Sequence, residues 1–422
     1  MKEPKLRFKE ENGAQFPDWE KSKFSDVFDN INNSTFSRDC LNYVDGNVKY
    51  IHYGDILTTF GSTVNVEASN VPYINKDVDC QKYQLLADGD IIVADTAEDD
   101  TVGKAVEIVN ASNVKVISGL HTIACRPKLK FTSGYLGYYM NSNPYHNQLR
   151  PYMQGIKVTS ISKANIALTN VSIPSLPEQQ KIASLFTELD NLIQSAEKEL
   201  EGYRELKQGM LQKMFPKKGE KVPEIRFPEF TGDWEQHKFN EFITLRMGHL
   251  FSPSDYVEEG KYNVVTISNV TGERLIDVSG MNQIDELPAN INDYQILKDG
   301  DLLISLTGNI GRVSYNCGEN NILNYRVGKI EFNKKKIDDK YIYTFLCQDS
   351  IIKEFIGKGQ GGAQPNISKP EVENLSILVP SELEQKKIGE YFSNLDNLIS
   401  IQQRELDGYK ELKKGLLQQM FC

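Results

Sequence analysis

The sequence predicts an α+β protein with two tandem domains of mixed β-sheet, each followed by a long helix. Three observations support this prediction: the second half of the chain repeats the first, each copy opens with short apolar runs separated by turn residues, and each copy closes with a heptad-patterned segment. Related copies that meet through equivalent surfaces tend to adopt twofold symmetry. We therefore expect the two helices to pack as an antiparallel coiled coil with pseudo-twofold symmetry.

The internal repeat is clearest toward the end of each copy. Residues 154–215 and 360–421 share 29 identities over 62 positions, and the chain's two tryptophans, Trp19 and Trp234, lie in matching contexts. We expect both indole rings to anchor a core or a domain edge. The repeat divides the chain into a first domain, a first helix, a second domain and a second helix, at residues 1–175, 176–215, 216–381 and 382–422.

The expected elements of the first domain follow from its alternation of apolar runs and turn residues. Residues 84–86 and 91–94 flank Asp88-Gly89, and an Asp-Gly pair between apolar runs predicts a β-hairpin. Strands are also expected at 102–108 and 121–125, and short helices at 135–140 and, in the second domain, at 341–347.

Both copies end in apolar residues at alternating three- and four-residue steps. Five heptads of this kind favour a coiled coil over an ordinary amphipathic helix that covers a domain, which is the alternative. Pro177 is expected to begin the first helix and Pro216 to end it, while Glu199 and Gln402 interrupt the seam. The residues expected to pair the helices are Ile182, Leu185, Leu189, Leu192, Tyr203, Leu206, Met210, Ile388, Tyr391, Leu395, Leu398, Tyr409, Leu412 and Leu416.

The charge of the chain is acidic overall and unevenly distributed. The formal net charge is −10, from 48 basic and 58 acidic residues. A nucleic-acid binder usually carries a basic face, but binding is local and net charge is an average. Residues 1–100 hold 10 basic and 19 acidic side chains, whereas residues 101–175 hold 8 basic and 1 acidic side chain. The acidity therefore does not exclude a nucleic-acid partner.

Cysteine usage and hydropathy indicate a cytoplasmic protein without a membrane span. The six cysteines are scattered and form no C-x-x-C pair, so free thiols in a reducing compartment are expected rather than disulfides or a metal site. No apolar run approaches the roughly 18–20 residues of a membrane span. The charged N-terminal segment has no signal-peptide hydrophobic region.

Catalytic signatures are missing from both copies. The sequence has no phosphate-binding glycine loop, no G-x-S-x-G and no histidine pair with metal-ligand spacing. Asn143-Pro144-Tyr145 is superficially similar to the N-P-P-Y signature of amino-methyltransferases but lacks its second proline. We expect no catalytic residues, no metal and no cofactor bound by this chain, and a role in recognition or scaffolding.

The duplicated segments carry a resemblance to a known family. The helix starts at 176–182 and 382–388 each run on to Leu-Asp-Asn-Leu-Ile and to a terminal Met-Phe, and residues 359–368 add a glycine-rich run, which the first copy lacks. With the tandem architecture, these features resemble the specificity subunit of type I restriction–modification enzymes over the whole chain. The missing glycines in the first copy suggest that the two copies read different sequences.

The resemblance implies a function and a set of partners. Each globular part would be a target recognition domain that reads one half of a bipartite asymmetric site on double-stranded DNA. The helices would set the spacer length and dock methyltransferase subunits, two in number, and motor–nuclease subunits would join them. S-adenosylmethionine, ATP and Mg²⁺ would be bound by those partners. The alternatives are a specificity module of a methyltransferase without a nuclease, and a coiled-coil scaffold with no DNA role.

Candidate DNA contacts are polar loop residues near glycines, because base edges are read by hydrogen bonds in the grooves. For each one the alternative is a solvated loop residue. His52 and Tyr53 could stack on bases, although a strand tyrosine more often packs in a core. Helix residues Lys198, Arg204, Lys207 and Lys410 could approach spacer phosphates or form a solvated face. The candidate DNA-binding residues are Thr58, Thr59, Ser62, Thr63, Arg150, Gln154, Lys157, Thr159, Ser160, Ser268, Asn269, Thr307, Asn309, Arg312, Gln360, Gln364 and Asn366.

Overall fold

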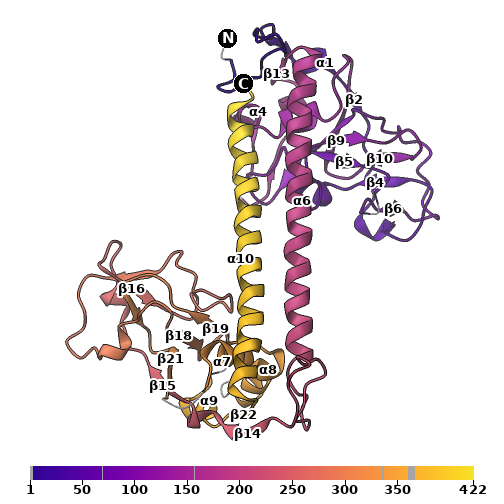
Figure 1. The fold of residues 1–422 in the computed structure, drawn as a ribbon. Helices are drawn as coiled ribbons and strands as arrows, with labels where there is room; N and C mark the ends of the chain where they lie inside the picture. The colour runs from indigo at the N-terminus through magenta and orange to yellow at the C-terminus, as the bar shows by residue number, and fades with distance from the viewer. Residues whose placement is uncertain (1–2, 69, 156, 334–336, 360–365) are drawn as a thin grey trace. The chain divides into compact units, whose positions relative to one another are not determined.

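The computed structural model describes residues 3–68, 70–155, 157–333, 337–359 and 366–422. The chain forms two compact units, Met1–Ala196 with Glu405–Cys422, and Glu197–Arg404. Each unit contains one mixed α/β domain together with a segment of each long helix, α6 (Leu176–Lys213) and α10 (Glu382–Gln419), which Figure 1 shows as uninterrupted helices. The expected α+β class with two tandem domains is confirmed.

The first domain is built on two sheets of mixed direction. The larger has the strand order β2-β11-β7-β9-β5 and the smaller β10-β4-β6-β3. Both are mixed because β5 runs parallel to β9 and β10 runs parallel to β4. The elements are β1 (Glu20–Lys23), α1 (Phe24–Val27), β2 (Phe28–Ile31), β3 (Leu41–Asn42), β4 (Lys49–Ile51), α2 (Tyr53–Thr58), β5 (Thr63–Asn65), β6 (Tyr73–Ile74), β7 (Ile91–Ala94), β8 (Thr96–Ala97), β9 (Ala105–Val109), β10 (Val116–Ser118), β11 (Thr122–Pro127), α3 (Tyr135–Met140), α4 (Asn143–Leu149), β12 (Thr159–Ser160), α5 (Lys163–Ile166) and β13 (Asn170–Ile173).

The second domain repeats this plan with fewer strands. Its sheets have the orders β15-β21-β18-β19 and β17-β16-β20, with β16 parallel to β20. A short pair, β14 with β22, corresponds to β1 with β13 of the first domain. The elements are β14 (Glu235–Lys238), β15 (Ile243–Met247), β16 (Tyr262–Val265), β17 (Asn282–Ile284), β18 (Leu302–Ser305), β19 (Val313–Tyr315), β20 (Asn321–Leu323), β21 (Val327–Phe332), α7 (Asp339–Leu346), α8 (Asp349–Lys358), α9 (Lys369–Glu373) and β22 (Ser376–Val379).

The predicted β-hairpin around Asp88-Gly89 is wrong, although the turn itself is present. Gly89 has a φ of 86°, and Asp90 accepts a hydrogen bond from the backbone N–H of Ala87. Residues 84–86 form no strand, and Leu86 instead donates its N–H to Val116. β7 pairs with β11 and β9, so the turn leads into a central strand rather than joining two neighbours. The predicted helix at 135–140 is confirmed as α3.

Each long helix begins with a buried charge pair and a buried amide. Arg7 donates two hydrogen bonds, from Nε and Nη2, to the carboxylate of Glu178 at 2.7 and 2.9 Å. Arg226 donates the same pair of bonds to Glu384 at 2.7 and 2.8 Å. Both glutamates are fully buried. Beside them, Gln179 donates to the carbonyl of Pro174 and accepts from Thr132, which ties the helix start to the loop before α3. These contacts explain why the Glu-Gln pair recurs in both copies.

Within each unit the two helix segments run antiparallel. In the first unit Asp190 of α6 contacts Lys413 of α10, and Phe186, one turn earlier, stacks on Phe421. In the second unit Lys207 pairs with Asp396 at 2.6 Å, and Arg204 donates to Gln403 at 3.3 Å. Residue numbers rise on one helix as they fall on the other.

The seam between the segments differs from the predicted one at four residues. Ile182, Leu189, Ile388 and Leu395 are buried as expected. The other expected residues that are at least half-buried are Leu185, Tyr203, Met210, Tyr391, Tyr409 and Leu416. Correcting the prediction, four expected seam leucines are 42–50% exposed: Leu192, Leu206, Leu398 and Leu412.

The reason is a shift of one residue in the heptad phase. The buried series follows Phe186, Leu200, Phe392 and Leu406, so the seam passes through the neighbours of the exposed leucines. Two of those neighbours are lysines, Lys207 and Lys413, which a search for apolar positions passes over. Glu199 on α6 is exposed and does not belong to the buried series, whereas Gln402 on α10 is buried.

The core of each domain is completed by the end of a helix from the other copy. Phe421 is buried against Trp19, Tyr139 and Phe186 in the first domain, with ring centroids 5.7–6.4 Å apart. In the second domain, Phe215 packs in the same way on Trp234, Tyr341 and Phe392 at 5.6–6.4 Å. Both tryptophans are buried. Within the described part of the chain, no helix is apolar over a stretch long enough for a bilayer.

Candidate nucleic-acid interface

In the first domain, three loops that follow strand ends are tied to one another by backbone hydrogen bonds. Gly119, after β10, donates to Ile51 at the end of β4. Asp95, after β7, donates its N–H to the carbonyl of His121 and accepts from Ile161. The loops after β4, β7 and β10, together with the segment around β12, therefore form one connected group. We call this group the loop frame of the first domain.

The second domain has the same loop frame, bond for bond. Asn324, after β20, donates to Val265 at the end of β16. Leu306, after β18, donates its N–H to Arg326 and accepts from Ile367. Backbone atoms make these bonds, so the side chains on the frame are left free to differ between the domains. A shared backbone with different side chains is what two readers of different sequences require.

Most candidate residues of the first domain lie on its loop frame or beside it. Thr58 and Thr59 are exposed at the C-terminal end of α2, where Thr58 donates to the carbonyl of Gly54. Gln154 and Ser160 exchange two backbone hydrogen bonds. β12 pairs with β8, and this pairing places Thr159 and Ser160 beside the loop after β7. Lys157 and Arg150 are exposed nearby in the sequence, and Arg150 lies 4.0 Å from Asp100.

The second domain brings two of its candidate segments together. Thr307 donates its hydroxyl to the side-chain oxygen of Asn366 at 2.8 Å, and the two residues form an antiparallel bridge. Asn309 and Arg312 are exposed in the same loop, with Arg312 donating to the carbonyl of Thr271 at 2.9 Å. Ser268 is exposed on the loop after β16.

Several candidates have structural roles or lie outside the described residues. Ser62 is buried, and its carbonyl accepts from Glu107; Thr63 is a half-buried residue of β5. Asn269 is buried and bridges the backbone of Thr266 and Asp277, so its amide is not available to DNA. The sequence pattern marked Ser62 and Asn269 because polar loop residues and loop-stabilising residues look alike. Gln360 and Gln364 fall outside the described residues.

Two further candidates are engaged inside the fold. His52 is buried and caps α2, its Nδ1 accepting from Gly54 at 3.0 Å; burial lowers the pKa of this imidazole. Lys207 is held by Asp396 in the helix seam rather than being free for phosphates. Tyr53 is half-buried, and its ring meets His121 edge-on at 5.3 Å.

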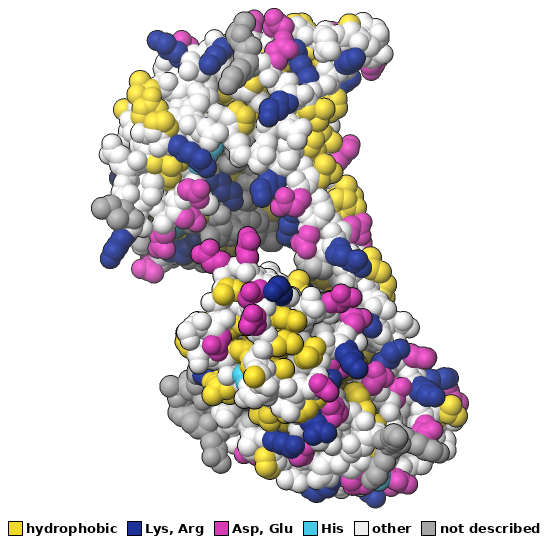
Figure 2. Space-filling view, turned by 90° about the vertical axis from the view of Figure 1, so that its left-hand side faces the viewer, with side chains coloured by type: hydrophobic (Ala, Val, Ile, Leu, Met, Phe, Trp, Pro, Cys, Tyr) yellow, Lys and Arg dark blue, Asp and Glu magenta, His cyan; other side chains and the backbone are white. Residues whose placement is uncertain are grey.

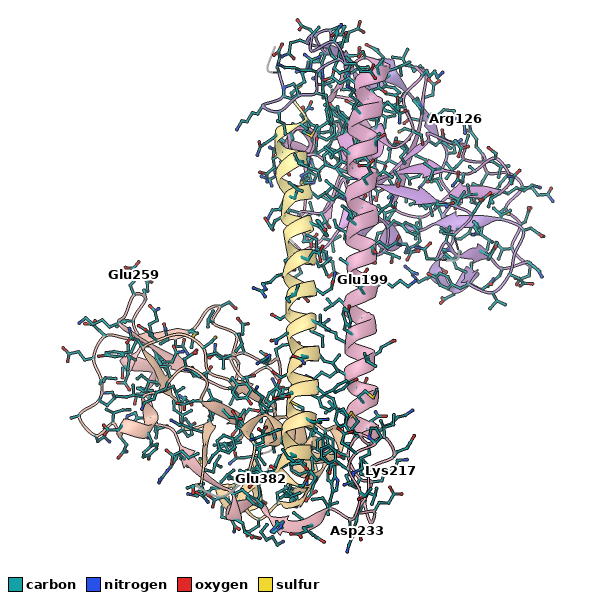
Figure 3. All side chains as sticks on the ribbon, viewed as in Figure 1. Arg126, Glu199, Lys217, Asp233, Glu259 and Glu382 are labelled. Carbon is teal, nitrogen blue, oxygen red and sulfur yellow. The ribbon has the colours of Figure 1, made fainter. Side chains whose placement is uncertain are left out.

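Some basic side chains of residues 101–175 are engaged in hydrogen bonds within the first domain. Arg126, labelled in Figure 3, forks the buried Asp90 at 2.7 and 2.8 Å. Lys104 donates to the carbonyls of Leu57 and Phe60 and so holds the end of α2, and burial lowers the pKa of its ammonium group. On the face shown in Figure 2, basic and acidic side chains are interspersed. Among the described residues no three His, Cys, Asp or Glu side chains are grouped to hold a metal ion.

Comparison with known proteins identifies the family. The family model of the type I restriction modification DNA specificity domain matches the chain twice, at residues 17–202 and 231–408. The chain belongs to the family of type I restriction–modification specificity subunits. Members of this family supply the non-catalytic, DNA-recognising component of type I systems, so the resemblance drawn from the sequence is confirmed.

Individual relatives agree with this assignment. The chain is 29% identical to the MjaVIII specificity subunit of Methanocaldococcus jannaschii over 283 residues, which are 64% of this chain and 65% of that protein. It is 25% identical over 434 residues to the putative MjaX specificity subunit of the same organism, covering 97% and 94%. The fold matches the crystal structure of a type I S subunit from M. genitalium with a TM-score of 0.60 at 13% identity, covering 100% and 99%.

Proposed function

We propose that each domain reads one half of a bipartite, asymmetric site on double-stranded DNA through its loop frame. The observation that carries the proposal is the identical set of backbone hydrogen bonds under different side chains in the two domains. Direct readout needs a rigid backbone that presents variable side chains to base edges. The exposed candidates, such as Ser160 and Lys157 in one domain and Asn309 and Arg312 in the other, meet that need.

The two long helices set the spacer between the half-sites. Each contains 38 residues, which at 1.5 Å per residue is a rod of about 57 Å. We propose that the rods pair as one antiparallel coiled coil with pseudo-twofold symmetry. The antiparallel contacts inside each unit support this arrangement.

The exposed leucines beside the seam are proposed to dock methyltransferase subunits. In the first unit these are Leu192 and Leu412, and in the second unit Leu206 and Leu398. All four precede a seam residue by one position, so in an antiparallel pair they flank the seam on the same side. Large apolar side chains that stay exposed beside a helix seam favour a protein partner. One leucine pair in each unit supports two methyltransferase subunits per chain.

Catalysis is assigned to the partner subunits, and DNA sequence specificity is assigned to this chain. Under this proposal the methyltransferase subunits bind S-adenosylmethionine, and motor–nuclease subunits use ATP and Mg²⁺. The chain itself binds no cofactor, has no catalytic activity and works in the cytoplasm, where its DNA lies. Because the 58 acidic side chains outnumber the 48 basic ones, the partners supply much of the phosphate neutralisation, and the isolated chain binds DNA weakly.

Sequencing of methylated bases tests the proposal. The chain is co-expressed with its methyltransferase partner, and modified positions are mapped on host DNA. The expected result is a split motif with an unread spacer; methylation without sequence preference would refute the DNA-reading role and favour a scaffold. Adding the motor–nuclease partner separates a complete restriction system, which then cleaves unmodified DNA, from a methyltransferase that works without a nuclease.

Two variants of this experiment test the parts separately. Exchanging residues 1–175 for the domain of another family member is expected to change one half-site and leave the other intact. A change in both halves would contradict independent reading. Replacing Leu192 and Leu412 by Glu is expected to release a methyltransferase subunit without unfolding the chain, whereas the exposed polar control Glu199→Gln keeps it bound.

A further inference from the structure

Each domain has a connection of three residues at the centre of its loop frame. In the first domain Gly119-Leu120-His121 joins β10 to β11, and in the second Asn324-Tyr325-Arg326 joins β20 to β21. In both, the first residue donates to the end of the parallel neighbouring strand and the third accepts from the loop that follows the central strand. His121 and Arg326 therefore occupy equivalent places, although no motif in the sequence aligns them.

Arg326 is positioned with its outer donors free. Its Nε donates to the hydroxyl of Tyr325 at 2.6 Å, and its guanidinium lies 5.2 Å from the centre of that ring. Among the described residues, neither Nη1 nor Nη2 has a hydrogen-bond partner. A hollow of about 370 Å³ opens beside this side chain, lined also by Tyr256, Thr266 and Leu250. The guanidinium is thus oriented by its neighbour while its two outer nitrogens remain available.

His121 presents a different group from the equivalent place. Its backbone is left-handed, with a φ of 53°, and its side chain is 48% exposed. The ring Nδ1 lies 3.4 Å from a carboxylate oxygen of Asp95 and 3.5 Å from the hydroxyl of Thr96, and Tyr53 meets the ring edge-on. When Nδ1–H is directed at Asp95, Nε2 is left as an acceptor pointing away from it. A non-glycine residue held in this backbone conformation is often found at functional sites.

We propose that Arg326 and His121 are specificity-determining residues that read one base pair each, at matching positions of the two half-sites. This inference rests on the proposed function and assigns residues to it. Free Nη donors in a planar fork complement O6 and N7 of guanine in the major groove. A single imidazole acceptor complements the amino group of adenine or cytosine and cannot form the guanine fork. The base pair that Arg326 reads in the second half-site is therefore a G·C pair, whereas the pair that His121 reads presents an adenine or cytosine amino group to the imidazole.

The test uses the chain assembled with its methyltransferase partner and a library of DNA sites randomised one position at a time. With Arg326→Gln, the preference for guanine at one position of the second half-site is expected to fall about 10- to 100-fold, while every other position is unchanged. Arg326→Lys keeps the charge but not the fork, and it is expected to lose most of the same preference. Arg246→Gln is the matched control, since Arg246 lies in the same domain and already pairs with Glu331 at 2.7 Å.

The outcomes separate this inference from the proposed function. A wild-type complex without a split motif would overturn the proposed function and the inference together. A split motif that Arg326→Gln leaves unaltered, or one with no guanine in the second half, would overturn the inference alone. Equal weakening on all sequences, with a shallower salt dependence, would assign Arg326 to a phosphate and also overturn it.

The first domain provides the second arm. His121→Asn retains a residue that tolerates the left-handed backbone, so loss of folding is not expected. We expect the base preference to change at one position of the first half-site and to stay unchanged throughout the second half-site. An unchanged motif, at an unchanged melting temperature, would refute the assignment of His121.

Discussion

The two domains stabilise equivalent helices, α3 in the first and α7 in the second, in different ways. In the first, the buried Glu107 of β9 accepts backbone hydrogen bonds from Gly134 and Gly137 at the start of α3. In the second, Asp338 lies directly before α7 and caps it by accepting from Tyr341 at 2.9 Å. The helix is retained although the capping residue moved from a distant strand to the adjacent position. The two domains thus share a backbone plan while the side chains that stabilise it differ.

The helix seam shows the same contrast at one pair of aspartates. Asp190 of the first unit is satisfied on both oxygens, by Lys413 and by the hydroxyl of Tyr138. Asp396 of the second unit has Lys207 on one oxygen, and its other oxygen is buried without a hydrogen bond. Burial raises the pKa of Asp396, and the nearby Lys207 opposes that shift. The two equivalent aspartates are therefore not equally well satisfied by hydrogen bonds.

Removing the phenyl ring that each domain receives from the end of a long helix is expected to have the largest effect. Phe421→Ala should destabilise the first domain, and Phe215→Ala the second, by about 4 kcal/mol each, because a buried phenyl ring is lost and a cavity remains. Hydrogen exchange measured domain by domain checks this. Each substitution should loosen one domain only; equal loosening of both would contradict separate cores. Leu383→Ala, at a 70% exposed position, is the control.

Breaking the buried charge pairs should distinguish the domains. Arg7→Ala and Arg226→Ala each leave a buried glutamate without its ion-pair partner, which should lower the free energy of unfolding by about 3 kcal/mol. Glu178 keeps a donor, the indole N–H of Trp19 at 3.2 Å, whereas the indole N–H of Trp234 has no partner. Arg226→Ala should therefore be the more damaging change in chemical denaturation. The reverse order would show that the indole bond does not matter.

Glu107 should make the stability of the first domain depend on pH. Burial raises the pKa of this carboxyl from 4.5 to about 7, despite the backbone N–H groups that oppose the shift. The folded chain thus binds a proton that the unfolded chain releases, and stability should fall by about 3 kcal/mol as the pH rises from about 4.5 to about 7. Glu107→Gln should flatten this slope, and the exposed control Glu98→Gln should not. A slope that survives in Glu107→Gln would refute the assignment.

The smallest effect concerns single hydroxyl groups. Tyr138→Phe leaves one oxygen of Asp190 without its donor and should cost about 1 kcal/mol. Tyr315→Phe removes a buried hydroxyl that has no hydrogen-bond partner, so it should be neutral or slightly stabilising. Thermal unfolding of the two variants gives the comparison. A penalty for Tyr315→Phe equal to that for Tyr138→Phe would mean that its hydroxyl is bonded in solution.

The sequence predicted the features that depend on repetition and periodicity. The duplication, the short helix α3 and the two long helices are predictable because each is marked by identical residues or by apolar spacing. The predicted heptad phase is one residue off, since Leu192-Ile193 and Leu398-Ile399 each offer two adjacent apolar positions, and the seam residue Lys207 is not apolar. The β-hairpin failed because strand partners are chosen by tertiary packing, not by the nearest turn.

The candidate interface was predicted less completely, for a physical reason. Thr58, at the end of α2, and Asn269, in a loop, are both flanked by threonine and apolar residues, but Thr58 is exposed whereas Asn269 is buried and bridges two backbone groups. His121 and Arg326 were missed because their equivalence lies in backbone hydrogen bonds between distant loops. Side-chain patterns carry no record of such bonds.

The first domain shares its core with residues that are synthesised long after its own strands. Met420 and Phe421 are buried in it, and the backbone N–H of Leu6 donates to Gln419 at 3.0 Å. At roughly 5–20 residues per second, the first domain waits on the order of ten seconds or more after its own strands emerge before its core can close. During that interval Trp19 and its neighbours are exposed to solvent, so chaperone binding to the nascent chain should be concentrated there.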